Sequence, residues 1–221
     1  MTLTPLDSPG KGAFNHHIST FLFMKLNQLG IPTQFVRSLN MREHLMHEGT
    51  PLPFDVHVRC ISGKKMAQDF GISEEEVFAP PLIEYIPKNK SLRYTFNEDF
   101  LMVLDWVTQE DLEEIKELAT YATHVIQGLL VSFDLSLVEI SLSMSYDLSD
   151  SISISGHLFP DFFCVLDLDS HDYLGIPYTA SLSDPHDFNL QGHQKIAHRL
   201  GLYSPSAACT HPVSPTFLRI V

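Results

Sequence analysis

Cations are scarce in this 221-residue sequence: 14 Lys and Arg stand against 27 Asp and Glu, for a formal net charge of −13. A nucleic acid or an anionic membrane surface requires a concentrated excess of Lys and Arg, so we expect neither as a partner. Cysteine is also rare. Cys60, Cys164 and Cys209 lie far apart and in no metal-ligand spacing, which excludes a disulfide framework and indicates a reducing, cytoplasmic compartment.

Long apolar runs are absent as well. No segment has the length of a membrane span, and the turn-rich stretch from Met1 to Gly12 contains no apolar run typical of a signal peptide. Enough apolar residues remain for a core, because 44% of the side chains are hydrophobic and 19% are charged. We therefore predict a globular protein of one domain or two small lobes.

Apolar periodicity and turn residues predict an α+β fold. Helices are expected at residues 14–29, 63–70, 108–130 and 190–200, with residues 74–76 as a solvated acidic helix start. Strands are expected at residues 33–39, 54–60, 135–146, 151–158 and 161–168, the last three as an antiparallel meander, with residues 44–53 as a connection. The longest helix has the clearest start, since Thr108 and Asp111 have the spacing of a capping box.

Twelve histidines suggest a metal site, and His44 and His47 form the best-spaced pair. No acidic or cysteine ligand accompanies them in a standard spacing, so ordinary surface histidines are the simpler interpretation. Cys60 would be a nucleophile if a cation lowered its pKa. A buried structural cysteine on a strand is the alternative that we favour.

Several ordered blocks resemble one family. They are Gly10-Lys11-Gly12 with Asn15, Gly30-Ile31-Pro32-Thr33, Val56-His57-Val58-Arg59, Pro80-Pro81-Leu82-Ile83-Glu84, Lys88-Asn89, Asn97-Glu98-Asp99 and Val138-Glu139. Their order and spacing are similar to those of phosphoribosylaminoimidazole-succinocarboxamide (SAICAR) synthetases. The resemblance runs from Gly10 to about Leu202 and implies an ATP-grasp-related α+β fold, with an antiparallel sheet and packed helices.

The resemblance also implies a reaction. The family joins a carboxylated aminoimidazole ribotide to aspartate, using ATP and magnesium to activate the carboxylate as an acyl phosphate. Arg59 matches the arginine that grips the substrate phosphate, a role suited to the guanidinium fork. The other expected substrate-binding residues are Lys11, Lys65, Lys88 and Glu139. Asp167 and Asp169, at the closing acidic motif, are the candidate metal ligands, with water-facing strand-end aspartates as the alternative.

Other positions depart from the family pattern. Ser141 and Ser143 stand where the family strand has lysine and glutamate, Lys90 replaces an aspartate, and the expected arginine falls near Leu174. Several dozen residues precede the Gly-Lys-Gly block in the family, whereas nine residues precede Gly10. We therefore expect the nucleotide-binding hairpin lobe to be absent.

Two hypotheses follow. The first is an ATP-dependent amide ligase acting on a phosphorylated small molecule, with a degraded ATP and metal site. The second is a non-catalytic ribotide-binding, regulatory or partner-binding descendant. We predict one domain over residues 1–203, a loosely packed tail over 204–221, and a homo-oligomer or a partner covering the absent lobe.

Overall fold

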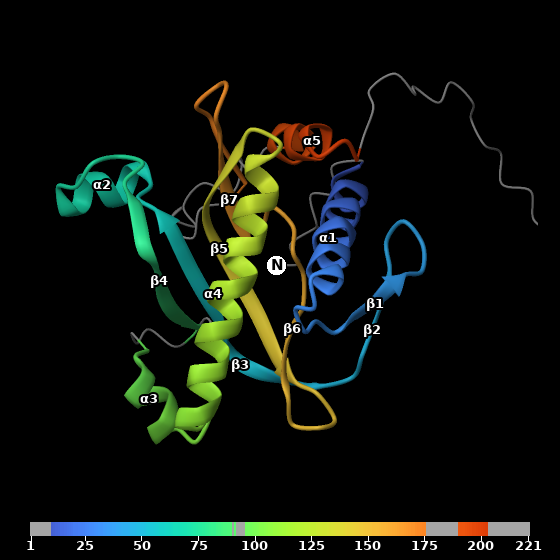
Figure 1. Cartoon of the computed structure of the whole chain (residues 1–221), viewed down its shortest axis with the longest axis vertical. Helices are drawn as coiled ribbons and strands as arrows, with labels where there is room; N and C mark the ends of the chain where they lie inside the picture. The colour runs from blue at the N-terminus through green and yellow to red at the C-terminus, as the bar shows by residue number, and fades with distance from the viewer. Residues whose placement is uncertain (1–9, 90, 92–95, 176–189, 203–221) are drawn as a thin grey trace, which may run out of the picture.

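A computed structural model of the chain describes residues 10–89, 91, 96–175 and 190–202 (Figure 1). Its centre is an antiparallel sheet in the order β4-β3-β5-β7-β8, with β6 also paired to β5. The strands are β3 (Thr50–Ile61), β4 (Val77–Pro87), β5 (Leu135–Tyr146), β6 (Ile152–Ser155), β7 (Phe163–Asp167) and β8 (Tyr173–Gly175). The predicted α+β class is confirmed.

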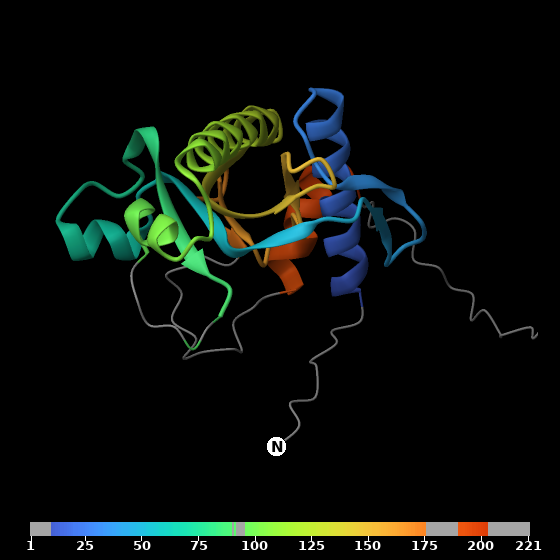
Figure 2. The same ribbon diagram turned by 90° about the horizontal axis from the view of Figure 1, so that it is seen from below.

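The helix α4 (Gln109–Val131) covers one face of this sheet (Figure 2). Its start is the predicted capping box, in which the side chains of Thr108 and Asp111 each accept the other's backbone N–H. Its apolar stripe, which includes Leu112, Ile115 and Ile126, is fully buried in the main core. The helix therefore forms from local signals and is held by packing against the sheet.

Two further helices pack against each other, and the second of them also contacts β8 (Figure 1). They are α1 (Lys11–Gln28) and α5 (Leu190–Arg199). Helix α1 ends before Gly30, whose φ of 75° is favourable only for glycine, as predicted. The predicted short helix is also confirmed: α2 (Lys64–Phe70) ends at Gly71, where φ is 65°. Among the described residues, no helix is both long and apolar enough to cross a membrane.

The predicted meander is wrong. Both β6 and β7 pair with the same edge of β5: β6 with Ser143–Tyr146 and β7 with Leu135–Ile140. The reason is length, because β5 has 12 residues, whereas β6 has 4 and β7 has 5. The edge of one long strand thus accommodates two short ones.

Three other local predictions need correction. Residues 44–53, expected as a connection, contain β2 (His44–Met46), which pairs with β1 (Phe35–Ser38), and the start of β3. Residues 74–76 form a turn with Glu75 at a φ of 64° instead of a helix start. Three elements were not expected: α3 (Glu98–Val103), β4 and β8. Strand β4 tolerates Pro80 and Pro81 because it lies at the sheet edge.

Candidate functional site

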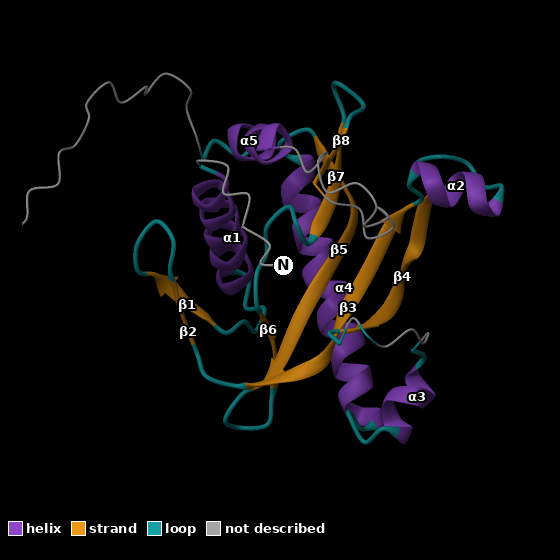
Figure 3. Cartoon of the chain, turned by 180° about the vertical axis from the view of Figure 1, so that it is seen from behind, coloured by secondary structure: helices purple, strands orange, loops and turns teal. Residues whose placement is uncertain are grey.

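The sheet face opposite α4 carries a row of polar side chains, which we call the polar face. It consists of Asp55, His57 and Arg59 of β3, Glu84 of β4, and Glu139, Ser141 and Ser143 of β5. These residues alternate along β3 with Phe54, Val56 and Val58, which are buried in the main core. Figure 3 shows β3 and β5 in the middle of the sheet, with α4 behind them. The alternation of side chains along β3 therefore gives the sheet one face in the core and one polar face.

Arg59 is held by a carboxylate on each side. Its Nη1 donates to Glu139, which lies directly opposite on β5, and its Nη2 lies 2.9 Å from Oε2 of Glu84 on β4. The Arg59 and Glu139 side chains are 7% and 2% exposed, whereas Glu84 is 54% exposed. Glu139 is therefore a buried partner of Arg59, whereas water can compete with Glu84 for the guanidinium.

His57 lies one row along β3 from Arg59. Its Nδ1 is 2.9 Å from Oγ of Ser141, and its Nε2 is 3.5 Å from Oε2 of Glu139. Its side chain is 2% exposed. An imidazole thus links the hydroxyl of one β5 residue to the carboxylate that also holds Arg59.

Lys88 lies at the edge of the polar face. Its Nζ is 3.5 Å from Oδ1 of Asp55, which also accepts a 2.7 Å hydrogen bond from Oγ of Ser143. The described polar face and Lys88 therefore combine three carboxylates with two permanent cations. Counting only these carboxylates and permanent cations, the arrangement has an excess of one negative charge.

The structure thus brings three predicted site residues together: Arg59, Lys88 and Glu139. Lys65 is not among them, because it extends from α2, is 61% exposed and pairs with Asp69 at 2.7 Å. Lys11 also lies in another cluster. The roles predicted for all five residues stay predictions.

The cluster around Lys11 joins α1 to α5. Asp161 Oδ1 lies 2.9 Å from Nζ of Lys11 and 3.1 Å from Nε2 of the buried His193. Burial alone would raise the pKa of Asp161, but the hydrogen bonds from His193 and Lys11 outweigh it and hold that pKa below its usual value. The charge of Lys11 is therefore already balanced.

The candidate metal ligands face an arginine. Nη2 of Arg199 lies 3.0 Å from Oδ1 of Asp167 and 2.6 Å from Oδ2 of Asp169. Oδ1 of Asp167 also accepts the backbone N–H groups of Asp169 and Ser170. The guanidinium already contacts both carboxylates, so the described arrangement does not fit magnesium. The predicted metal site stays a prediction.

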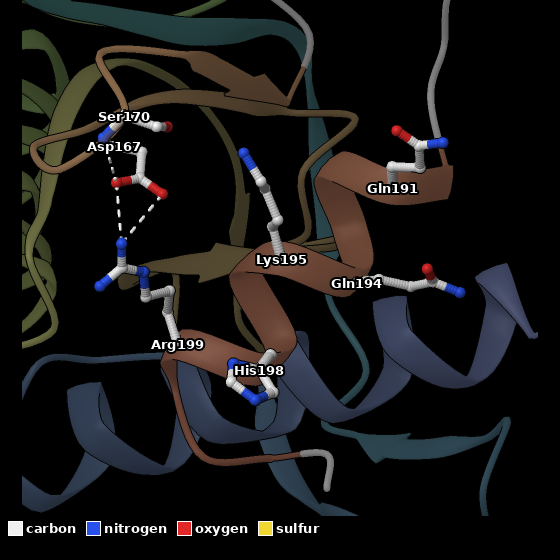
Figure 4. A pocket seen from close by; sticks show the side chains of 7 residues that line it. All are labelled: Asp167, Ser170, Gln191, Gln194, Lys195, His198 and Arg199. Atoms are coloured by element: carbon white, nitrogen blue, oxygen red, sulfur yellow. Dashed lines mark hydrogen bonds and ion pairs between the residues drawn. The ribbon is translucent and has the colours of Figure 1, made fainter. Parts of the chain in front are cut away.

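Asp167 and Arg199, but not Asp169, line an open pocket of about 590 Å³ between the β7–β8 turn and α5 (Figure 4). It is lined by Asp167, Ser170, Gln191, Gln194, Lys195, His198 and Arg199. Across the described part of the chain, no group of three or more His, Cys, Asp or Glu is arranged to hold a metal ion. His44, one member of the histidine pair considered as a metal site, has its Nε2 2.8 Å from Oγ1 of Thr20.

Cys60 faces the core and is fully buried. Burial, and then the charge of Glu139, raise the pKa of its thiol to about 12, so a thiolate nucleophile is disfavoured at neutral pH. The structural interpretation of Cys60 is confirmed. Sequence reasoning missed His57, Glu84 and Arg199 as site residues, although polar residues at every second position of β3 were a readable signal for His57.

The comparisons with known proteins agree with this architecture. A family model described as SAICAR synthetase matches residues 4–169. The phosphoribosylaminoimidazole-succinocarboxamide synthase of Rhodospirillum centenum is 30% identical over 198 residues, covering 87% of this chain and 76% of the relative. Synthase A of Bradyrhizobium diazoefficiens is 29% identical over 203 residues, with the same two coverages.

Solved structures give the same result. The crystal structure of the synthase from Ehrlichia chaffeensis superposes with a TM-score of 0.77 at 27% identity, covering 89% of this chain and 83% of that one. A SAICAR synthetase in complex with ADP has a TM-score of 0.79 at 21% identity, which supports the fold alone. The ordered motifs, the family match and the fold agree, and the chain belongs to the SAICAR synthetase family.

Proposed function

We propose that this chain is an ATP-dependent carbon–nitrogen ligase that joins a carboxylated aminoimidazole ribotide to aspartate. The observation that carries the proposal is Arg59, buried on the polar face at the position that the family resemblance assigns to phosphate binding. A guanidinium presents a planar fork that matches two phosphate oxygens. Family membership supports the same class of reaction.

Glu84 gives the phosphate a route to Arg59. It lies on the edge strand β4 and is half-exposed, so a phosphate that reaches Nη2 of Arg59 would replace a solvent-accessible carboxylate. Glu139 is buried and would remain in place, orienting the guanidinium. Lys88 would add positive charge at the edge of the polar face, where Asp55 is shared between Lys88 and Ser143.

ATP and magnesium complete the proposed reaction. ATP supplies the phosphoryl group that activates the carboxylate, and magnesium offsets the charge of the triphosphate. Asp167 and Asp169 would be available to a metal only if Arg199 moved away from them. We therefore route no step of the reaction through these two residues.

A second candidate is ribotide binding without ligation. It is favoured by Ser141 and Ser143, which occupy positions where the family strand has a lysine and a glutamate, and which here hydrogen-bond to His57 and Asp55. In this alternative, the polar face retains recognition and lacks part of the machinery for acyl transfer.

One experiment separates the two. The purified chain is incubated with ATP, magnesium, aspartate and the carboxylated ribotide while ADP and the amide product are quantified, and ribotide affinity is measured by calorimetry. Product formation supports the ligase. Binding without product or ADP supports the second candidate, and neither binding nor product would contradict both.

Self-association is also proposed. Val36, Leu45 and Met41 of the β1–β2 hairpin are large apolar side chains with 40% or more of their surface exposed. Exposed apolar side chains on one hairpin are a candidate surface for contact with another chain. A monomer at high concentration in sedimentation equilibrium would contradict this proposal.

A further inference from the structure

His57 occupies the centre of the polar face. On its own strand, it lies between Asp55 and Arg59, and its cross-strand partners are Glu84 on β4 and Ser141 on β5. Its two ring nitrogens contact Ser141 and Glu139, as described above. An imidazole so placed can exchange a neutral hydrogen-bonding role for a cationic one when it takes up a proton.

The charge balance of the polar face explains why a proton on His57 would favour phosphate binding. The face and Lys88 carry one more negative than permanent positive charge, and a phosphate brought to Arg59 adds further negative charge. Like charges at such separations in a buried environment disfavour binding. Protonation of His57, 3.5 Å from Glu139, would neutralise the excess next to the carboxylate that holds Arg59.

We propose that His57 is a positioning residue for phosphorylated ligands: as an imidazolium it offsets Glu139, so that a ligand phosphate can replace Glu84 on Arg59. The proposal rests on the ribotide binding proposed above. It predicts that binding draws a proton onto the protein, because the ligand stabilises the charged form of the imidazole.

The position of Ser141 supports a compensating role. Directly opposite residues of antiparallel strands have Cβ atoms about 4.5–5.5 Å apart, so side chains at 57 and 141 reach the same space. This chain has a serine at position 141 and an ionisable ring across from it on β3, hydrogen-bonded to that serine. A cation placed at position 141 would therefore reach the space that the imidazolium occupies.

The test uses three variants of the full chain. His57→Gln keeps a polar side chain that can bond to Ser141 but cannot become charged. His57→Gln/Ser141→Lys places a cation on β5, and His57→Gln/Ser141→Met has nearly the same side-chain length without the charge. Each variant is first compared with wild type by far-UV circular dichroism and thermal unfolding. Affinity for the carboxylated ribotide is then measured by calorimetry in buffers of different ionisation enthalpy, which reports proton uptake.

We expect wild type to bind the ribotide with proton uptake and His57→Gln to bind it about tenfold to a hundredfold more weakly without uptake. The lysine variant should regain affinity, still without uptake, whereas the methionine variant should not. Unchanged affinity and uptake in a folded His57→Gln would overturn the inference and leave the proposed function standing. If His57→Gln does not fold, absence of proton uptake in wild type overturns it. No ribotide binding by wild type would instead contradict the proposed function.

Discussion

Arg59 of β3 and Glu139 of β5 are directly opposite each other and form a buried ion pair across the polar face. They are separated by 80 residues in the chain, so only sheet pairing brings them together. The pair has two consequences. Loss of either partner would leave a buried charge without its main partner, and the pair fixes the orientation of the guanidinium that we propose binds phosphate.

The first prediction concerns stability. Arg59→Leu leaves the Glu139 carboxylate buried without its main partner, so the free energy of unfolding should fall by about 3–5 kcal/mol. Urea denaturation provides the measurement. As a control, Lys65→Leu breaks only the exposed pair with Asp69 and should leave stability nearly unchanged. Equal effects of the two substitutions would contradict the assignment of Arg59 to a buried pair.

The second prediction concerns Glu84. Glu84→Gln removes a negative charge that competes for Nη2 of Arg59, so the carboxylated ribotide should bind several-fold more tightly. Glu117→Gln, on the exposed side of α4, makes the same change in net charge away from the polar face. Ribotide calorimetry on both variants separates a local effect from a general one. Weaker binding by Glu84→Gln would show that Glu84 supports the site.

The third prediction concerns pH. Burial, followed by the nearby His16 and His157, lowers the pKa of His44 from 6.5 to about 4. Between these values the unfolded state binds more protons, so stability is present above pH 6.5 and is lost as pH falls toward 4. With solvent screening, we expect the loss to be on the order of 1–2 kcal/mol.

His44→Gln tests this pH dependence. The variant cannot take up the proton, so the difference in unfolding free energy from wild type should shrink as pH falls from 7 toward 4. Carboxylates that titrate in the same range contribute equally to both proteins and cancel in the difference. A difference that is constant with pH would disprove the role of His44.

The fourth prediction concerns the acidic pair near α5. Arg199→Gln removes the guanidinium from Asp167 and Asp169 and leaves two carboxylates facing one space, so magnesium should bind this variant more tightly than it binds wild type. Calorimetry with magnesium chloride measures the change. Adding Asp169→Asn should abolish the gain, and a gain that survives would place the metal elsewhere.

Local signals were sufficient for much of the helical structure. The capping box of Thr108 and Asp111 and the glycines Gly30 and Gly71 act within a few residues of the helix ends that they define, so their effects were predictable. The family motifs also placed Arg59 correctly on a strand, and the alternation of Phe54 and Val56 with polar residues was present in the sequence.

Pairing between distant segments was not predictable in this way. The division of one β5 edge between β6 and β7 depends on strand lengths and on the path of the intervening turn, and β4 is a strand despite its prolines because it lies at an edge. Neither property is local.

The sequence by itself thus determined the helices α1, α2, α4 and α5, the polar and apolar alternation of β3 and the family, because each depends on neighbouring residues or on ordered motifs. The tertiary structure decided which charges meet. It pairs Glu84 and Glu139 with Arg59 and places His57 between Ser141 and Glu139. It also pairs Arg199 with Asp167 and Asp169. The physical reason is that ion pairs and hydrogen bonds act over a few ångströms in space, whereas their members lie 25 to 84 residues apart in the chain.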